Sequence, residues 1–155
     1  MIYILFVLAF IIHNIEEAIW LPGWSKHAKK YHRTVEFNEF VFAVLIITVS
    51  GIMLTFLKCT TDNKTVNCIY LGYVGMMVLN AIFPHLLATI ALRRYAPGLI
   101  TAIVLNAPIG CYIIFESLNE IEFFNIIIST VLMSVIIPFS LPVLFKLSKC
   151  MKFDE

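Results

Sequence analysis

Residues 2–21 read IYILFVLAFIIHNIEEAIWL, an apolar run that contains one histidine, one asparagine and two adjacent glutamates. A hydrocarbon core about 30 Å thick needs roughly 20 mostly apolar residues per helix, so this run predicts a transmembrane helix. No lysine or arginine precedes Lys26, so the run lacks the basic segment of a cleavable signal peptide. We therefore expect the first helix to be retained.

The same apolar character extends through the chain of 155 residues, of which 61% are hydrophobic and only 14% charged. Open sheet edges are not viable in lipid, so we expect an all-α integral membrane helical bundle, a single domain over 1–155. The predicted spans are about 2–21, 37–57, 69–92, 98–115 and 122–145. No room is left for a water-soluble catalytic domain, and a net charge of +1 excludes a strongly basic nucleic-acid binder.

Lysine and arginine are distributed unevenly between the two ends of these spans. The nine on one side are Lys26, Lys29, Lys30, Arg33, Arg93, Arg94, Lys146, Lys149 and Lys152, whereas the other side has only Lys58 and Lys64. The positive-inside rule then predicts an outside N-terminus and a short cytoplasmic tail, 146–155. We expect the cell membrane of a prokaryote. Cys59 and Cys68 would flank an outer loop, either as a disulfide or as two free thiols.

Polar residues inside the first span indicate a functional site, because ionisable groups within a membrane are costly and rare. At 100° per residue, Glu16 lies about 60° to one side of His13 and Glu17 about 40° to the other. The three side chains therefore share one face of the helix. This spacing can direct an imidazole and two carboxylates at one metal ion or at one proton-transfer site.

Other spans add polar residues that we expect to lie at a similar depth. Asn80 and His85 would point about 140° apart on a straight helix, but Pro84 frees a carbonyl and can swing them together. Asn106 lies in the fourth predicted span and Glu39 begins the second. Pro84, Pro108, Pro138 and Pro142 should kink their helices without ending them. The spans could thus form one polar site open toward the cytoplasmic leaflet.

A structural interpretation of the same residues stays open. Glu16 and Glu17 could be interfacial carboxylates at the end of a short first span, and His13 could be an interhelical hydrogen-bond partner. Glu36 and Glu39 could mark a helix N-terminus, where acidic residues are favoured. We favour a functional site for His13, Glu16 and Glu17 because so many polar groups in so few residues are expensive to bury for packing alone.

The motif His13-Asn-Ile-Glu16-Glu17, followed by Asn80 and His85 in a later span, resembles the HXXEE family of integral membrane proteins. The resemblance covers most of the chain and implies a site without implying a reaction. A looser likeness is to the CAAX-type intramembrane proteases, whose sites combine paired glutamates, histidines and an asparagine. Here Leu21 stands where an arginine is expected and Ala81 where a phenylalanine is expected, and the spans are too few for that fold.

The first functional hypothesis is a membrane enzyme acting on a lipid or other hydrophobic substrate. Its catalytic residues would be His13, Glu16, Glu17 and His85, which could also bind zinc or iron, while Asn80, Asn106 and Glu39 would orient the substrate. Without metal, a buried glutamate would act as general acid or base opposite a histidine. The alternatives are a proton- or ion-coupled carrier, possible as a homo-oligomer, and a non-catalytic membrane subunit whose polar face packs on a partner.

Overall fold

The computed structural model describes residues 1–29 and 33–151, and all regular elements in these ranges are helical. The predicted all-α class is confirmed. Within these ranges, five segments are long and apolar enough to cross a membrane, and each overlaps one predicted span. They are Ile2–Ala28, Phe37–Thr60, Lys64–Leu92, Leu99–Ser117 and Phe123–Cys150. Lys30 and the end of the predicted tail, 152–155, lie outside the described residues, and the start of that tail continues the last helix.

Three of the five segments are divided into shorter elements. In chain order the elements are α1 (Ile2–Ser25), η1 (Lys26–Ala28), α2 (Phe37–Thr60), α3 (Lys64–Asn80), η2 (Ala81–Leu86), α4 (Leu87–Leu92), α5 (Leu99–Thr101), η3 (Ala102–Asn106), α6 (Ala107–Ser117) and α7 (Phe123–Cys150). The segments η2 and η3 are π-helical, whereas η1 is a short 3₁₀ turn.

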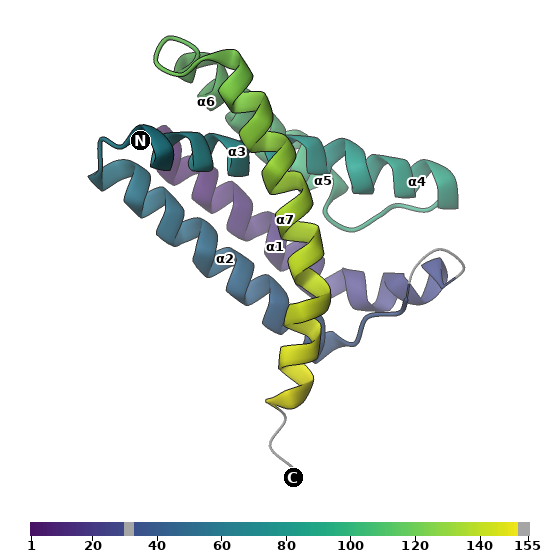
Figure 1. Ribbon diagram of the computed structural model, residues 1–155. Coiled ribbons are helices and arrows are strands. Elements are labelled where there is room, and N and C mark those ends of the chain that lie inside the picture. Colours follow the sequence, from purple (N-terminus) through teal and green to yellow (C-terminus); the bar gives the residue numbers. More distant parts are fainter. Residues whose placement is uncertain (30–32, 152–155) are drawn as a thin grey trace.

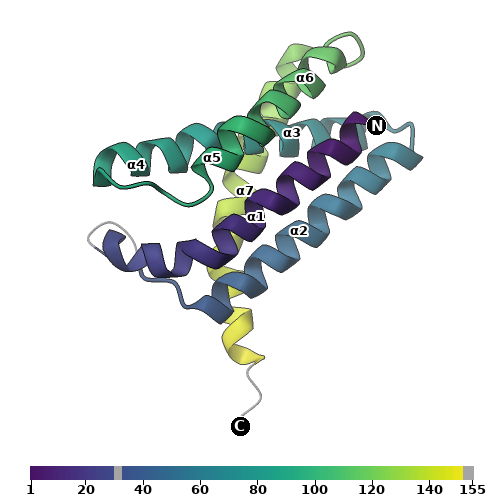
Figure 2. The same cartoon turned by 180° about the vertical axis from the view of Figure 1, so that it is seen from behind.

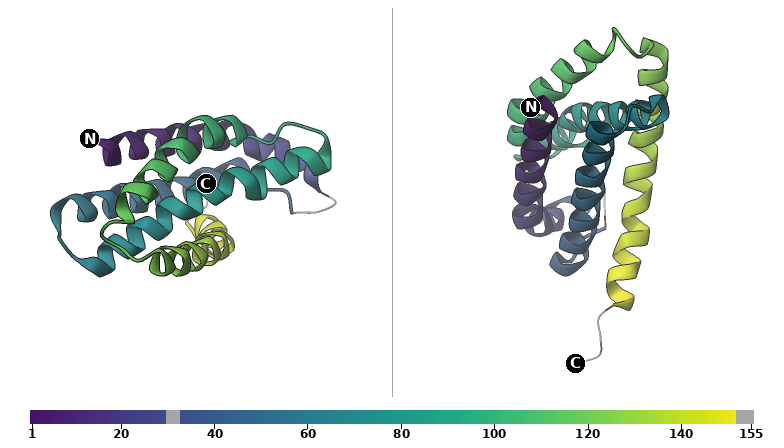
Figure 3. Two further views of the ribbon diagram at one scale, coloured as in Figure 1. Left: turned by 90° about the horizontal axis from the view of Figure 1, so that it is seen from above. Right: turned by 90° about the vertical axis from the view of Figure 1, so that its left-hand side faces the viewer.

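The helices α1 and α2 lie side by side, as Figures 1 and 2 show from opposite sides. The long helix α7 packs against α3 and α2, and α6 packs against α3 (Figure 3). Between these helices and α1 lies an apolar core, in which the ring of Phe10 meets the ring of Tyr73 edge-on at a centroid distance of 5.4 Å. This packing places α1 between α2 and the α5–η3 segment, which fixes what the polar face of α1 can contact.

Besides its apolar core, the protein buries several polar side chains and exposes many large apolar ones. His13, Glu39 and Asn106 have no exposed surface, whereas Phe115 is 69% and Phe139 75% exposed. Large exposed apolar surface of this extent is unfavourable in water but matches hydrocarbon. The surface therefore agrees with the length and composition of the five helices in suggesting membrane insertion.

Both π-helical segments adjoin a proline. Pro84 lies within η2, where Phe83 has non-helical backbone angles (φ −125°, ψ 118°), and Pro108 follows η3 at the start of α6. Proline has no N–H to donate and its ring crowds the carbonyl four residues earlier, so the helix is locally rearranged there. In contrast, α7 continues through Pro138 and Pro142, which agrees with the expectation that these prolines do not end their helix.

A side-chain cap holds the connection between α2 and α3. The Asn63 side chain accepts hydrogen bonds from the backbone N–H groups of Thr65 and Val66, at 2.8 and 3.3 Å. Cys59 and Cys68 on either side of this connection are free thiols. Of the two states that the sequence left open for these cysteines, the structure has the unpaired one.

The crossing of α3 and α7 depends on a glycine. A Cβ atom at Gly72 would lie 2.5 Å from the backbone oxygen of Ser129, so the two helix backbones approach too closely for any side chain. Small residues at such crossings are typical of helices that pack in membranes. At Gly23 in α1, by contrast, a Cβ atom would meet nothing within 4 Å.

Gly72→Ala should therefore destabilise the protein by about 1–3 kcal/mol, the usual cost of overpacking, because backbone must shift to admit the methyl group. Gly23→Ala is the matched control and should be neutral or stabilising by up to about 1 kcal/mol, through its better helix propensity. Thermal unfolding of both variants in detergent measures the difference. Equal stability of the two variants would contradict the close α3–α7 crossing.

Candidate functional site

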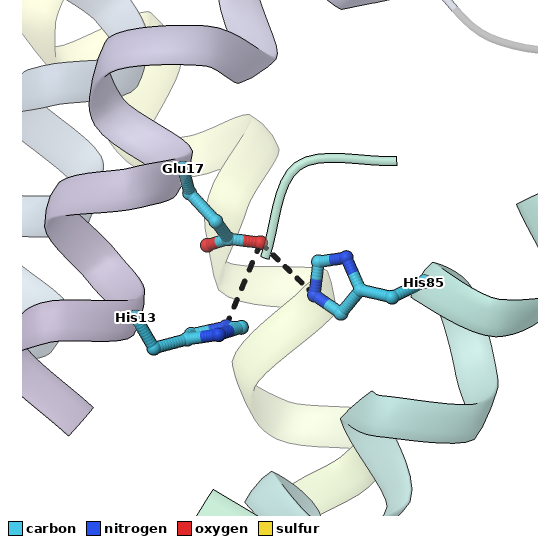
Figure 4. Close-up of side chains that lie close together, drawn as sticks. All are labelled: His13, Glu17 and His85. Carbon is cyan, nitrogen blue, oxygen red and sulfur yellow. Dashed lines mark ion pairs between the residues drawn. The ribbon is translucent and has the colours of Figure 1, made fainter. Parts of the chain in front are cut away.

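His13, Glu17 and His85 form a compact group at the junction of α1 and η2. The Glu17 Oε1 atom lies 3.1 Å from His85 Nε2 and 3.8 Å from His13 Nε2, as the dashed lines in Figure 4 mark. One ligand atom from each residue lies within 4.8 Å of the other two. Both histidines are buried, and the Glu17 side chain is 16% exposed. Three potential metal ligands therefore converge in a largely dry environment.

Two local features of the sequence produce this convergence. On α1, His13 and Glu17 are four residues apart and so lie on one face of the helix. In the third segment, the rearranged helix around Pro84 brings Asn80 and His85 together, with Asn80 Nδ2 at 3.0 Å from His85 Nε2. Asn80 Nδ2 also lies 3.3 Å from His13 Nε2. The structure thus joins four of the predicted site residues.

Glu16 contacts different groups from those that Glu17 contacts. Its Oε1 atom accepts a hydrogen bond from the backbone N–H of Gly98 at 2.9 Å and another from the Tyr95 hydroxyl. Its Oε2 atom accepts from the Thr101 hydroxyl at 2.7 Å. The sequence grouped Glu16 with Glu17 as a metal ligand, whereas the group of ligand atoms within the described ranges contains only Glu17. Both Glu16 oxygens instead hold the turn before α5.

This network also fixes the protonation of His13. The Thr101 hydroxyl has a single hydrogen, and its acceptors are Glu16 Oε2 at 2.7 Å and the Gly98 carbonyl at 3.1 Å. The contact of 3.0 Å between His13 Nδ1 and Thr101 Oγ1 must then have Nδ1–H as its donor. In the neutral imidazole this leaves the lone pair on Nε2, which faces Glu17 and Asn80. A histidine held in this way is prepared to bind a metal ion or to accept a proton.

Gly98 covers the group with its backbone. Its φ of +92° favours glycine, and a Cβ atom there would lie 2.7 Å from His85 Cε1 and 2.9 Å from His13 Cε1. Gly98, Thr101 and Tyr95 were not predicted from the sequence as site residues. The Pro97-Gly98 pair does signal a turn, but nothing in the sequence indicates that this turn packs on the first helix.

Tyr95 lies at the solvent-exposed end of this hydrogen-bond network. The residue lies between the membrane-spanning segments, and its side chain is 42% exposed. Burial of the remainder, followed by the hydrogen bond to Glu16, raises the pKa of the Tyr95 phenol above its ordinary value. The phenol therefore stays protonated at neutral pH and remains a donor to the Glu16 carboxylate.

Glu39 lies in a separate ion-pair cluster. Its carboxylate is fully buried and lies 2.9 Å from the Arg33 guanidinium and 2.8 Å from the Lys149 ammonium group. No hydrogen bond or ion pair joins Glu39 to His13, Glu17 or His85 among the described residues. The sequence prediction that Glu39 orients a substrate gains no support from this position. A buried carboxylate needs paired charges, and Glu39 uses them to tie the start of α2 to the end of α7.

Asn106 is also fully buried, at the end of η3. Neither its Oδ1 nor its Nδ2 atom has a hydrogen-bond partner within the described parts of the chain. Buried amides are almost always satisfied, so two unpartnered atoms at this position are unusual. By comparison Asn14, also buried, donates to Thr48 Oγ1 at 2.8 Å.

Residues 4–113 match the family described as a protein of unknown function with HXXEE motif. The chain is 42% identical over 144 residues to the uncharacterized protein YrkK of Bacillus subtilis (strain 168), a similarity that covers 91% of each chain. No solved structure matches the chain. The matched region includes His13, Glu17, Asn80, His85 and Gly98, and it ends before α7.

The unpartnered amide of Asn106 gives a stability prediction. Asn106→Leu should raise the free energy of unfolding of the empty protein, because a buried polar group without a partner costs about 1–3 kcal/mol. Asn14→Leu is the control and should lower the free energy of unfolding, because it removes an existing hydrogen bond. Chemical or thermal unfolding in detergent tests both. A loss of stability in both variants would mean that Asn106 has a partner, such as bound water.

Proposed function

We propose, from the premise that this chain belongs to the HXXEE-motif family of unknown function, that it is a membrane-embedded enzyme acting on a lipid or other hydrophobic substrate. The observation that supports this most directly is the convergence of His13, Glu17 and His85 within 4.8 Å. Buried ionisable groups inside an apolar bundle are costly and mark reaction or transport sites by default. Five apolar helices and the bacterial relative favour the cell membrane as its location.

The donor set fits zinc or iron(II). Two imidazoles and one carboxylate are the ligands of many catalytic zinc sites and of non-haem iron sites, and no thiolate is present among them. Such an ion, when bound, polarises a substrate oxygen or lowers the pKa of a bound water toward about 7. The roles of the protein groups follow from their contacts. Thr101 orients His13, and Gly98 excludes water from one side with its backbone.

A cavity beside the group provides a path for the substrate. It has a volume of about 460 Å³, and its lining includes Glu16, Trp20, Trp24, Arg94 and Tyr95. Aromatic and basic side chains of this kind are typical of a membrane interface. With the tail in the cytoplasm, as the distribution of lysine and arginine favours, this cavity faces the cytoplasmic leaflet. A substrate entering there would meet Tyr95 and Glu16 before it reaches His13.

Asn106 has a substrate-binding role in this proposal. Its unpartnered amide can both donate to and accept from the polar part of a substrate. Packing would explain Asn106 less well, since an apolar residue of the same size would avoid the cost of burying two unsatisfied atoms.

The main alternative is a proton-coupled carrier, and one observation favours it specifically. Hydrogen bonds run from the Tyr95 hydroxyl through Glu16 and Thr101 to His13, and ion-pair distances of 3.8 and 3.1 Å then join His13 to Glu17 and Glu17 to His85. A chain of titratable groups of this kind can relay protons without breaking any bond in a substrate.

Metal analysis of detergent-purified protein tests whether the group formed by His13, Glu17 and His85 binds zinc or iron. We expect about one zinc or iron atom per wild-type chain and its loss in His13→Ala, Glu17→Gln and His85→Ala, because each removes a ligand. Two matched controls should retain the metal at saturation. They are Glu16→Gln, which changes the adjacent glutamate, and His27→Ala, which changes an exposed histidine outside the group.

Two results would contradict this assignment. One is a wild-type protein that binds neither metal after reconstitution at neutral pH. The other is loss of metal in Glu16→Gln as complete as in Glu17→Gln, measured at equal folded yield.

Proton flux separates the enzyme from the carrier. We expect wild-type protein in liposomes with an imposed pH gradient to pass no more protons than empty liposomes, followed with an enclosed pH-sensitive dye. A carrier would collapse the gradient, and Tyr95→Phe would then block it by removing the outermost hydroxyl of the relay. Flux that depends on Tyr95 would replace the enzyme proposal with the carrier.

A further inference from the structure

The hydrogen atoms around Asn80 cannot be placed consistently while its amide nitrogen faces the histidines. Asn80 Nδ2 lies 3.0 Å from His85 Nε2, which itself lies 3.1 Å from Glu17 Oε1. If His85 Nε2 accepts from the amide, it faces the carboxylate oxygen with no hydrogen between two acceptors. If instead it donates to Glu17, its N–H faces the amide hydrogens. One of the two contacts is therefore unfavourable in either case.

Rotating the Asn80 amide by 180° about its last bond exchanges its two polar atoms without changing its shape. Asn80 Oδ1 then faces His13 Nε2 and His85 Nε2, and His85 Nε2 itself lies 3.1 Å from Glu17 Oε1. The Thr101 contact assigns the His13 hydrogen to Nδ1, and a metal-bound His85 would likewise carry its hydrogen on Nδ1, so in that state His13 Nε2, His85 Nε2, Asn80 Oδ1 and Glu17 Oε1 all present lone pairs. Lone pairs gathered in a buried pocket repel one another unless a cation lies between them.

Four of the six separations between these atoms lie close to those of a tetrahedral metal site. Ligand bonds of about 2.0–2.2 Å, as in zinc sites, place neighbouring ligand atoms of a regular tetrahedron about 3.3–3.6 Å apart. The four measured separations are 3.0, 3.1, 3.3 and 3.8 Å, which lie on both sides of that range. The ligand atoms of the two histidines lie within 4.8 Å of each other, and a regular tetrahedron would bring that separation into the same range.

We propose that the amide oxygen of Asn80 is the fourth ligand of the metal, an inference that rests on the metal-binding function proposed above. The sequence predicted Glu16 as a metal ligand, but both Glu16 oxygens already accept hydrogen bonds from Gly98, Tyr95 and Thr101. Asn80 is a neutral ligand, so Glu17 remains the single carboxylate that balances the charge of the ion. The site is then two imidazoles, one carboxylate and one amide oxygen.

Substitutions of Asn80 distinguish a ligand from a hydrogen-bond donor. Asn80→Ala removes both amide atoms, whereas Asn80→Asp keeps an oxygen in place and removes the N–H groups. A ligand role predicts zinc affinity at least tenfold weaker in Asn80→Ala, as the loss of even an indirect partner of a metal ligand commonly costs 10–100-fold. It predicts affinity in Asn80→Asp equal to or tighter than that of the wild type. A donor role predicts that both variants lose affinity alike.

The measurement is competition for zinc between metal-stripped, detergent-purified protein and a chromophoric chelator. Asn14→Ala serves as the control, since this buried asparagine contacts Thr48 and not the metal group, and its zinc affinity should equal that of the wild type. Asn80→Asp preserves the shape of the side chain and gives the decisive reading if Asn80→Ala fails to fold.

The outcomes separate this inference from the function on which it rests. If the wild type binds no zinc or iron, the proposed function fails and the fourth ligand fails with it. If the wild type binds zinc and Asn80→Ala binds it as tightly, only the role of Asn80 is overturned. Weakened binding by Asn80→Asp, to the level of Asn80→Ala, would likewise overturn it and leave Asn80 as a donor to the histidines.

Discussion

The structure depends on the need to satisfy two adjacent carboxylates inside an apolar bundle. Glu16 and Glu17 lie about 100° apart on α1, so they face different neighbours. Glu16 accepts three hydrogen bonds from the turn that begins α5, and Glu17 pairs with His85. Leaving either carboxylate without partners would cost several kcal/mol, so α1 must lie against both segments at once.

This constraint explains the backbone of the fourth segment. The turn before α5 must present a free N–H to Glu16 and also approach both histidines closely, and only a glycine meets both conditions at Gly98. Thr101 then lies one turn further on, where its hydroxyl connects Glu16 with His13. Glu16 therefore holds this part of the backbone, whereas Glu17 faces the two histidines.

Patterns within one helix could be predicted from the sequence, and contacts between helices could not. The spacing of His13 and Glu17 follows from helical geometry, and Pro84 correctly indicated that Asn80 and His85 could meet. The different roles of Glu16 and Glu17 depend on how the fourth segment packs, which periodicity does not specify. Glu39 was assigned to the site because the sequence does not reveal which cations pair with it. One of them, Lys149, comes close to Glu39 only because α7 packs on α2.

Under the proposed function, the adjacent glutamates combine rigidity with reactivity in a single membrane helix. A single carboxylate that both held the turn and bound a cation would have to give up one set of partners to gain the other. Dividing the tasks lets Glu16 keep its hydrogen bonds while the surroundings of Glu17 change protonation or bind metal. Thr101 links Glu16 to His13 Nδ1. Glu16 therefore also determines that Nε2 is the His13 nitrogen that faces Glu17.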